Sequence, residues 1–319
     1  MSFISNCTAE AIKDAATSLI NGDLVAFPTE TVYGLGADAG NEKAVKKIYQ
    51  VKGRPSDHPL IVHISNLKQL DKWAREIPEY AIKLARSFWP GPMTLILPRT
   101  PLAKDFITGG QDNVGIRIPD QTLALALLSE FEQQGGMGVA APSANRFGKV
   151  SPTDAKAVEQ ELGEYLTEKD LILDGGSCEV GVESTIIDCT TPTPIILRPG
   201  AITSAMIKDA TGLDVGSENI LKTKASGLLE SHYAPTAKVF LDQTPNKGDG
   251  FIALSDIKTP EGVIRLASPK NNVEYAKLLY QALRQADNQK IAKVFICPPF
   301  GDDIAVVIRD RINKAAKGE

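Results

Sequence analysis

The chain has 319 residues, of which 43% are hydrophobic and 23% charged, and its formal net charge at pH 7 is −4. This length suggests about two domains, and this composition is that of a globular chain, which excludes collagen, a coiled coil and long disorder. Proteins that bind nucleic acid mainly through its phosphates are usually basic, so the acidic balance disfavours that class without excluding a local basic pocket.

Neither a membrane nor a secretory destination is expected. No apolar run approaches the roughly 20 residues that cross a bilayer, and residues 1–11 lack the basic and apolar regions of a signal peptide. The four cysteines form no Cys-x-x-Cys pair, and the three histidines do not cluster near them. We therefore expect a cytoplasmic protein with reduced cysteines, without a structural zinc site and without membrane contact.

Residues 1–215 alternate between two apolar patterns. Apolar residues at helical spacing predict helices at 9–20, 44–51, 81–88 and 121–133. Short apolar or alternating runs predict strands at 24–27, 60–64, 93–97, 114–118, 139–141, 171–173, 185–188 and 195–197. This alternation is typical of a layered α/β domain with a mixed sheet.

The rest of the chain divides in two. Residues 216–236 lose clear periodicity and contain several Ser and Gly residues, which predicts an interdomain linker. The α/β pattern then resumes over 237–319, with expected strands at 239–241, 251–254, 263–266 and 294–297 and helices at 273–285 and 303–316. We predict a small open α/β domain there.

The common nucleotide-binding and catalytic motifs are not found in this sequence in their usual context. It lacks the GxxxxGK[ST] loop, and it has no HExxH or GxSxG motif. Residues 34–39 fit the pattern GxGxxA, but residues 28–33 separate them from the preceding strand, whereas a nicotinamide-binding turn follows its strand directly. An ATP-dependent enzyme with this sequence needs an unconventional phosphate site.

Basic residues recur where elements end. Lys52 and Arg54 flank Gly53, and in an extended segment their side chains point the same way. Arg117 alternates with Ile116 and Ile118 on its strand, and Arg198 ends another strand. His63 likewise points away from Val62 and Ile64 on its own strand. Together these groups favour a small anionic ligand, because Arg offers a rigid fork for phosphate or carboxylate and Lys a mobile charge. Each motif alone also fits a solvated loop or an ordinary turn.

Several segments, in order along the chain, resemble the YrdC-like family. They are FPTETVYGLGADA at 27–39, KGRP at 52–55, PLIVH at 59–63, WPGPMT at 89–94, the surroundings of Arg117, Ser143-x-Asn145, SPT at 151–153 and LRPG at 197–200. HYAP at 232–235 and the extra C-terminal domain resemble the long, two-domain form of that family. The resemblance implies a twisted mixed sheet flanked by helices, followed by a smaller, Rossmann-like α/β domain.

The resemblance also implies a reaction and its partners. Members of the long form join L-threonine, bicarbonate and ATP into L-threonylcarbamoyl-AMP and pyrophosphate, with Mg²⁺ bridging the phosphates. A threonylcarbamoyl-transferase complex then modifies the adenosine next to the anticodon of certain tRNAs. A nucleotidyltransferase of this kind is therefore expected, and a weak contact with tRNA is left open.

The family pattern assigns roles to individual positions of this sequence. Lys52 and Arg54 are expected to be catalytic. The residues expected to bind ATP are Lys52, Arg54, His58, Asn113, Ser143, Asn145, Ser151, Arg198 and Tyr233, with His58 standing where the family often has Asn. The residues expected to bind L-threonine are Thr31, His63, Arg117, Ala141 (through its backbone) and Ser184. No metal ligand is assigned.

The linker, 216–236, is expected to close over the site as a lid, because threonylcarbamoyl-AMP is labile and water must be excluded. The family often has a Pro-Gly-Met stretch and a basic residue before the His, and residues 226–231 lack both the Pro and the basic residue. We therefore expect His232 and Tyr233 to contribute more of the closure.

Two other functions are weighed against the synthase. A non-catalytic RNA-binding maturation factor fits a concave basic face, but the chain is acidic and has no interleaved aromatic and basic patch. A carbamoyl-transfer enzyme that uses carbamoyl phosphate is the other alternative. Such proteins usually add zinc-finger-like and kinase-like modules, which this chain lacks.

Overall fold

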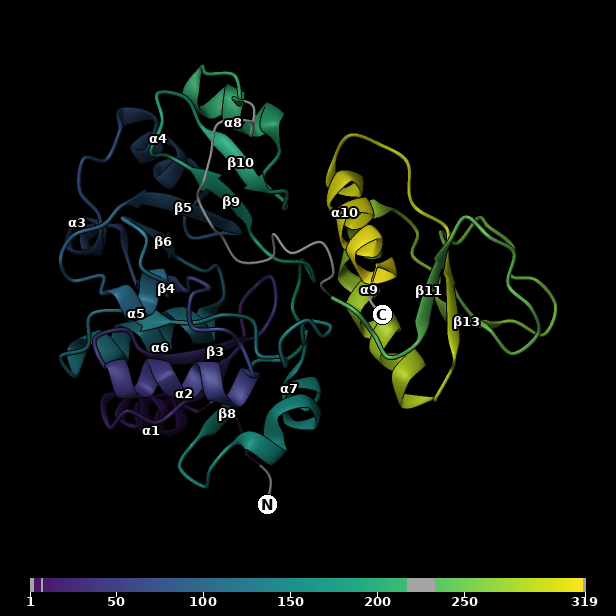
Figure 1. Ribbon diagram of the computed structural model, residues 1–319, viewed down its shortest axis with the longest axis horizontal. Coiled ribbons are helices and arrows are strands. Elements are labelled where there is room, and N and C mark those ends of the chain that lie inside the picture. Colours follow the sequence, from purple (N-terminus) through teal and green to yellow (C-terminus); the bar gives the residue numbers. More distant parts are fainter. Residues whose placement is uncertain (1–2, 7, 217–232, 318–319) are drawn as a thin grey trace.

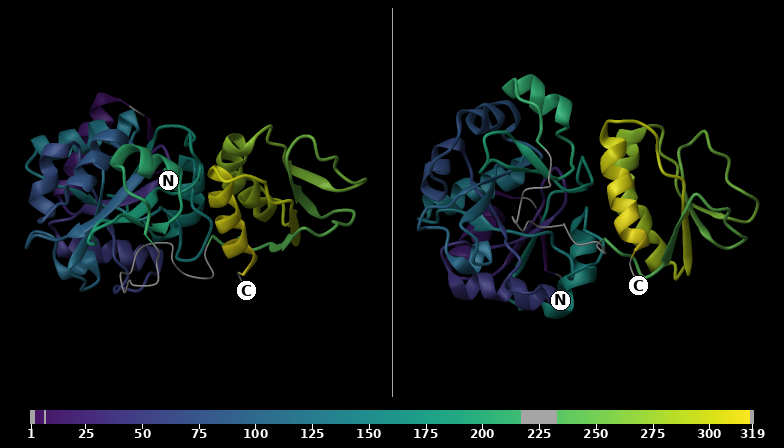
Figure 2. Two further views of the ribbon diagram at one scale, coloured as in Figure 1. Left: turned by 90° about the horizontal axis from the view of Figure 1, so that it is seen from above. Right: turned by 45° about the horizontal axis from the view of Figure 1, so that its top comes forward.

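The computed structural model describes residues 3–6, 8–216 and 233–317. A larger N-terminal part and a smaller C-terminal part lie side by side, and the two helices α9 (Asn272–Asn288) and α10 (Ile304–Ala316) of the smaller part face the larger one (Figure 1). Figure 2 shows the same arrangement from two other directions. No helix in the described ranges is long and apolar enough to span a membrane.

In the described part of the chain, ten strands form one mixed sheet, in the order β1-β8-β2-β3-β7-β4-β6-β5-β9-β10. Their bounds are β1 (Ile4–Asn6), β2 (Val25–Phe27), β3 (Gly34–Asp38), β4 (Ile61–His63), β5 (Met93–Pro98), β6 (Asn113–Arg117), β7 (Val139–Ala140), β8 (Leu171–Asp174), β9 (Thr185–Asp188) and β10 (Ile195–Arg198). The sheet contains both parallel pairs, such as β4 with β6, and antiparallel pairs, such as β5 with β6.

Helices lie against both faces of this sheet. They are α1 (Ala9–Ile20), α2 (Glu42–Lys52), α3 (Leu70–Trp73), α4 (Glu79–Phe88), α5 (Asp105–Thr108), α6 (Thr122–Gln133), α7 (Ala155–Leu162) and α8 (Ser204–Thr211), with short 3₁₀ turns at Leu67–Gln69 and Gly163–Tyr165. Strand β2 illustrates the layering, because Val25 and Phe27 belong to the apolar cluster that includes α1 and α6, whereas Ala26 belongs to the separate cluster that includes residues of α2, α3 and α4.

The C-terminal part is an open parallel sheet. Its strands are β11 (Lys238–Leu241), β12 (Gly250–Ile252), β13 (Ile264–Ala267) and β14 (Lys293–Ile296), in the order β11-β14-β12-β13. The core beneath α9 and α10 continues into the N-terminal part, where it includes Val32, Val150 and Val182. The two parts therefore share buried apolar contacts in addition to polar ones.

The predicted α/β architecture is confirmed, including the mixed sheet and the smaller parallel sheet, and every predicted helix and strand has a counterpart within a few residues. The elements without a prediction are β1, β3, α3, α5, α7 and α8. The GxGxxA stretch forms β3, which pairs antiparallel with β2, and is not a turn before a helix. Most of the predicted linker and lid, 217–232, lies outside the described residues, so the domain bounds stay a prediction.

Candidate active site

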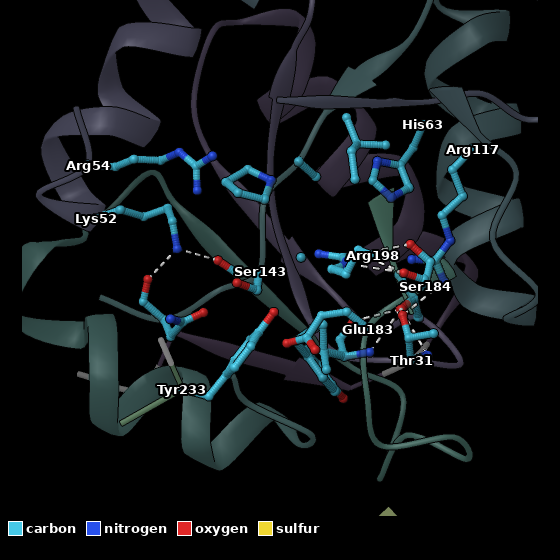
Figure 3. A pocket seen from close by; sticks show the side chains of 18 of the residues that line it. Thr31, Lys52, Arg54, His63, Arg117, Ser143, Glu183, Ser184, Arg198 and Tyr233 are labelled. Carbon is cyan, nitrogen blue, oxygen red and sulfur yellow. Dashed lines mark hydrogen bonds between the residues drawn. The ribbon is translucent and has the colours of Figure 1, made fainter. Parts of the chain in front are cut away.

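One cavity opens where the ends of β4, β6, β7, β9 and β10 meet the loop before β3. Figure 3 shows two groups of labelled side chains at its opposite ends, Lys52, Arg54 and Ser143 at one, and Thr31, His63, Arg117 and Ser184 at the other. Arg198 and Glu183 lie between them, and Tyr233 lies near the Lys52 end. The other lining residues are Thr29, Val32, Tyr33, Gly34, Ile61, Ala141, Pro142, Asn145 and Phe147.

Lys52 and Arg54 reach the cavity through the end of a helix. Lys52 is the last residue of α2, and Gly53 closes the helix in the left-handed conformation, with φ +62°. The expected extended segment is therefore wrong, because a left-handed C-cap reverses the chain between the two residues. Both side chains nevertheless line the same cavity, so the predicted convergence does occur.

Burying the positive charges of Lys52 and Arg54 at this end of the cavity is electrostatically unfavourable. Lys52 is 2% exposed, and its Nζ donates hydrogen bonds to the carbonyl oxygens of Ser143, at 2.6 Å, and Asn145. Burial, and then the neighbouring Arg54, hold the pKa of Lys52 well below its usual value. Burial, and then Arg198, also lower the pKa of Arg54 to about 10. A polyanion bound here relieves this cost, because it supplies opposite charge to buried cations.

The opposite end is built by two paired strands. In the register of β4 with β6, His63 lies directly opposite Arg117, and both side chains line the cavity while Val62 and Ile116 enter the core. Arg117 Nη2 donates to Glu30 Oε1, at 2.6 Å, and to Thr31 Oγ1, at 2.9 Å. The predicted orientations of His63 and Arg117 are confirmed.

Three buried polar atoms at this site have no hydrogen-bond partner among the described residues, namely His63 Nδ1, Arg117 Nε and Asn145 Oδ1. A buried donor or acceptor without a partner is costly, so a ligand that bonds to these atoms gains affinity. Arg117 offers a donor that suits a carboxylate, and Asn145 an acceptor that suits a hydroxyl or amine.

Arg198, in the middle of the cavity, is hydrogen-bonded to Ser184 at the Arg117 end. Arg198 Nη2 donates to the carbonyl oxygen of Ser184, at 2.9 Å, and to its hydroxyl, at 3.1 Å. The Ser184 hydroxyl also bonds to the Thr94 hydroxyl, at 2.8 Å. These contacts fix the start of β9 against the end of β10, so both residues are held in place before any ligand binds.

His63 is held in its neutral form. Burial, and then the charge of Arg117, lower its pKa to about 3. At neutral pH the imidazole is therefore uncharged, and Arg117 supplies the positive charge at this end. The ring packs edge-on against Phe27, with their centroids 5.9 Å apart.

The structure places most of the predicted ligand residues on this one cavity. The lining includes Thr31, Lys52, Arg54, His63, Arg117, Ala141, Ser143, Asn145, Ser184, Arg198 and Tyr233. Three predicted ATP contacts do not line it, namely His58, Asn113 and Ser151. The His58 ring packs edge-on against Phe147, Ser151 donates to Glu183, and Asn113 begins β6 at the end opposite Arg117. His232 lies outside the described residues.

Sequence reasoning gave no role to two buried carboxylates. Glu30 pairs with Arg117 and also accepts from the backbone nitrogen of Asp120, at 3.0 Å. Glu183 accepts from Ser151, Tyr280 and Arg311, and its pKa falls to about 2 because Arg311 and Arg198 outweigh the effect of burial. Glu30 lies within the quoted segment 27–39, and Glu183 directly precedes Ser184, an expected ligand of L-threonine. A carboxylate inside or beside such a segment is the signal that could have identified them.

The described side chains do not make a cage for a metal ion. No group of three or more His, Cys, Asp or Glu residues in the described ranges is placed to hold one. Glu183, the carboxylate that lines the cavity, already accepts hydrogen bonds at both oxygens. This donor set does not fit a metal ion held by protein carboxylates.

Comparisons with known proteins agree with this fold. A family model described as "Telomere recombination" matches residues 17–200, and one described as "Threonylcarbamoyl-AMP synthase, C-terminal domain" matches residues 202–317. Threonylcarbamoyl-AMP synthase of Bacillus subtilis is 41% identical, and the alignment covers 96% of this chain and 93% of that one. The enzyme of the same name from Pyrococcus abyssi is 38% identical, with coverages of 96% and 94%.

The likeness extends to three dimensions. The crystal structure of P. abyssi Sua5 in complex with L-threonine superposes with a TM-score of 0.88, at 37% identity, and covers 99% of this chain and 98% of that chain. The match includes both the N-terminal and the C-terminal parts, so it is not confined to the larger sheet. The chain therefore belongs to the family of threonylcarbamoyl-AMP synthases that carry this C-terminal domain.

Proposed function

We propose that this protein is an L-threonylcarbamoyladenylate synthase, which forms L-threonylcarbamoyl-AMP and pyrophosphate from L-threonine, bicarbonate and ATP. One observation carries the assignment in this chain. A single buried cavity has Lys52 and Arg54 at one end and Arg117 at the other. Two separate anionic groups, a triphosphate and an amino-acid carboxylate, match these two ends in charge.

L-Threonine occupies the end built by β4 and β6. Arg117 holds its carboxylate, for which a guanidinium is the best-matched side chain. The hydroxyls of Thr31 and Ser184 and the neutral imidazole of His63 supply hydrogen bonds, and the backbone of Ala141 closes the wall. The P. abyssi relative determined with L-threonine supports a threonine site in this family.

ATP occupies the other end. Lys52 and Arg54 neutralise the phosphates, and Ser143 and Asn145 bond to the nucleotide from the loop after β7. Arg198 lies between the two ends, where the α-phosphate must meet the threonine derivative. Tyr233 covers the nucleotide from the segment that enters the C-terminal part.

The chemistry requires positioning more than reactive side chains. The threonine amine combines with bicarbonate to give a carbamate, with loss of water. A carbamate oxygen then attacks the α-phosphorus of ATP, a new P–O bond forms, and the bond to the β-phosphate bridging oxygen breaks to release pyrophosphate. Lys52, Arg54 and Arg198 stabilise the charge that develops on the phosphates, which is the main demand of phosphoryl-type transfer.

The finer assignments belong to the same proposal. ATP is delivered with Mg²⁺, which shields the phosphate charge. His58 and Asn113 do not line the cavity and contribute to ATP binding indirectly. Ser151 contributes to ATP binding through its hydrogen bond to Glu183. The product passes to a threonylcarbamoyl-transferase complex that modifies tRNA, with at most a weak contact between this chain and the tRNA. The reaction takes place in the cytoplasm.

Pyrophosphate release tests the proposal. The purified chain is incubated with ATP and Mg²⁺, with and without L-threonine and bicarbonate, and the nucleotide product is identified by mass. We expect release that needs both co-substrates and a product with the mass of threonylcarbamoyl-AMP. ATP binding without any such product contradicts the proposal, and salt-sensitive binding of tRNA in its place favours an RNA-binding factor.

A further inference from the structure

Arg311, on helix α10 of the C-terminal part, is fully buried against the N-terminal part, with 0% of its surface exposed. Its Nε donates to Glu183 Oε2, at 2.8 Å, and its Nη2 donates to the carbonyl oxygen of Pro199, at 3.0 Å. The guanidinium carbon lies 5.0 Å from the centre of the Tyr233 ring. Arg311 therefore contacts three segments that are separate in sequence.

Each of these three segments carries residues of the cavity wall. Glu183 lines the cavity and precedes Ser184, Pro199 follows Arg198, and Tyr233 lines the cavity itself. Arg311 does not line the cavity, so its influence on a ligand must pass through these neighbours. Its contacts include none of the side chains at the Arg117 end.

Tyr280, on helix α9, completes the arrangement. Its hydroxyl donates to Glu183 Oε2, at 2.9 Å, and its ring stacks on Tyr233, with centroids 5.6 Å apart and planes inclined by 24°. Tyr233 has a φ of +62°, which is rare for a residue with a side chain. Arg311 and Tyr280 thus contact the ring of a residue whose backbone conformation is itself uncommon.

The Glu183 carboxylate accepts hydrogen bonds from both parts of the molecule, and we call this set of bonds the joint. Glu183 therefore has a structural role and is not a proton acceptor. Ser151 donates to its Oε1, at 2.6 Å, while Tyr280 and Arg311 donate to its Oε2. Both oxygens are engaged in a buried setting, with Glu183 only 5% exposed, where such bonds fix geometry. The packing is close here, since a Cβ on Gly181 would lie 2.5 Å from the Cα of Lys277 on α9.

We propose that Arg311 and Tyr280 are positioning residues, through which the C-terminal part sets the geometry of the ATP end of the cavity. They do so by holding Glu183, the Pro199 carbonyl and the Tyr233 ring. The inference rests on the proposed function, because that function assigns Arg198 and Tyr233 to the nucleotide. It goes beyond that function by assigning a role in nucleotide binding to two residues of the C-terminal part that do not touch the nucleotide.

Binding to the full-length protein tests the inference independently of turnover. Dissociation constants for ATP alone and for L-threonine alone are measured by calorimetry on the wild type, Arg311→Met and Tyr280→Phe. We expect Arg311→Met to weaken ATP binding at least about tenfold, because small displacements of positioning groups have large effects. L-Threonine binding changes less than about threefold, because its residues contact neither side chain. Tyr280→Phe has a smaller effect of the same selectivity.

Two further variants separate positioning from folding. Arg309→Met removes an arginine from the same helix whose hydrogen bonds, to the carbonyls of Pro299 and Gly301, stay within the C-terminal part, and ATP binding should not change. Arg311→Met leaves the Glu183 carboxylate buried without its cation, so the double variant with Glu183→Gln keeps the joint neutral. Thermal unfolding of each variant confirms that it is folded at the temperature of the titration.

The outcomes distinguish the two proposals. Equal ATP affinity in the wild type and the folded double variant overturns the inference, as does an equal loss of ATP and L-threonine affinity in Tyr280→Phe. Failure of the wild type to form threonylcarbamoyl-AMP overturns the proposed function instead. In that case the selective loss of ATP binding still reports whether Arg311 and Tyr280 position the nucleotide end.

Discussion

At the scale of single residues, Arg117 presents different atoms to different partners. Its Nη2 bonds to Glu30 and Thr31, while its buried Nε has no partner in the described part of the chain. The Glu30 carboxylate thus holds the guanidinium in place, and the buried Nε remains as a donor for a ligand. A lysine at this position keeps the charge opposite Glu30 but loses the fork.

We therefore expect Arg117→Lys to weaken L-threonine binding at least tenfold, or about 1.4 kcal/mol, and to leave ATP binding within about twofold, because the two ends are separate. Calorimetric titration with each ligand measures both effects. Arg99→Lys is the matched control, because Arg99 pairs with Asp105 outside the cavity. An equal loss of both affinities would contradict the division of the cavity into two ends.

The lowered pKa of Lys52 predicts that ATP binding is coupled to proton uptake. Burial, and then Arg54, hold its pKa well below the usual value, and the phosphates of bound ATP raise it again because they favour the ammonium form. ATP binding should therefore take up a proton, and ATP affinity should fall as the pH rises through the pKa of Lys52 in the free protein. Lys52→Met removes this pH dependence and lowers the affinity itself.

Calorimetry in two buffers with different ionisation enthalpies measures this proton uptake directly. Lys47→Met serves as the control, because Lys47 lies on the same helix but bonds to Gly22 and Asp23 away from the cavity. Identical binding heats in the two buffers, after correction for dilution, would rule out the uptake.

The site was predictable where a single segment carried the information. Alternation within each strand placed His63 and Arg117 on the side away from the core. The resemblance to the family predicted that the remaining cavity residues lie near them. The pairing of Glu183 with Arg311 was not predictable in this way, because 128 residues separate the two partners. Two single charges in different segments carry no signal of their contact, which depends on how the C-terminal part docks.

At the scale of elements, the end of α2 determines where two cations point. Gly53 adopts a φ of +62°, and a Cβ there would lie 2.8 Å from Arg146 Nη2. We expect Gly53→Ala to lower the free energy of unfolding by about 1 kcal/mol, the usual cost of a side chain in the left-handed region, and to weaken ATP binding by displacing Lys52 and Arg54.

Gly212→Ala provides the comparison for this variant. Gly212 closes α8 with a φ of +76°, and a Cβ there meets no atom within 4 Å. The alanine should therefore cost similar stability without changing ATP affinity. Urea unfolding and calorimetric titration of both variants measure the two effects, and a normal ATP affinity in Gly53→Ala would show that the turn does not set the site.

Regular patterning made some elements predictable, and its absence hid others. Helix α1 has apolar residues at regular helical spacing and a Thr8 cap, and its predicted bounds match the structure. The four-residue helices α3 and α5 and the three-residue strand β1 are too short to show a period. Strand β3 contains Gly34 and Gly36, which weaken a strand pattern, and Gly36 is needed because a Cβ there would lie 2.8 Å from Val139.

At the scale of the whole molecule, the buried pair of Glu183 and Arg311 connects the stability of the two parts to pH. The folded pKa of Glu183, about 2, lies below the ordinary value of 4.5. The stabilisation is thus fully present above pH 4.5 and is lost as the pH falls toward 2, because the unfolded chain binds the proton first. A difference of this size corresponds to on the order of 3 kcal/mol.

We expect the free energy of unfolding of the wild type to fall between pH 4.5 and pH 2, and Glu183→Gln to show a shallower fall, so that the two proteins converge in acid. Urea unfolding at several pH values measures both slopes. Glu179→Gln is a control for the loss of a nearby carboxylate outside this buried network. The control should retain the wild-type slope, whereas parallel slopes in the wild type and Glu183→Gln would mean that other groups govern the acid transition.

This pH dependence matters for function because the same carboxylate joins Arg311 to the cavity wall. Acid that protonates Glu183 weakens these hydrogen bonds. It should therefore loosen the ATP end of the cavity before the larger sheet unfolds.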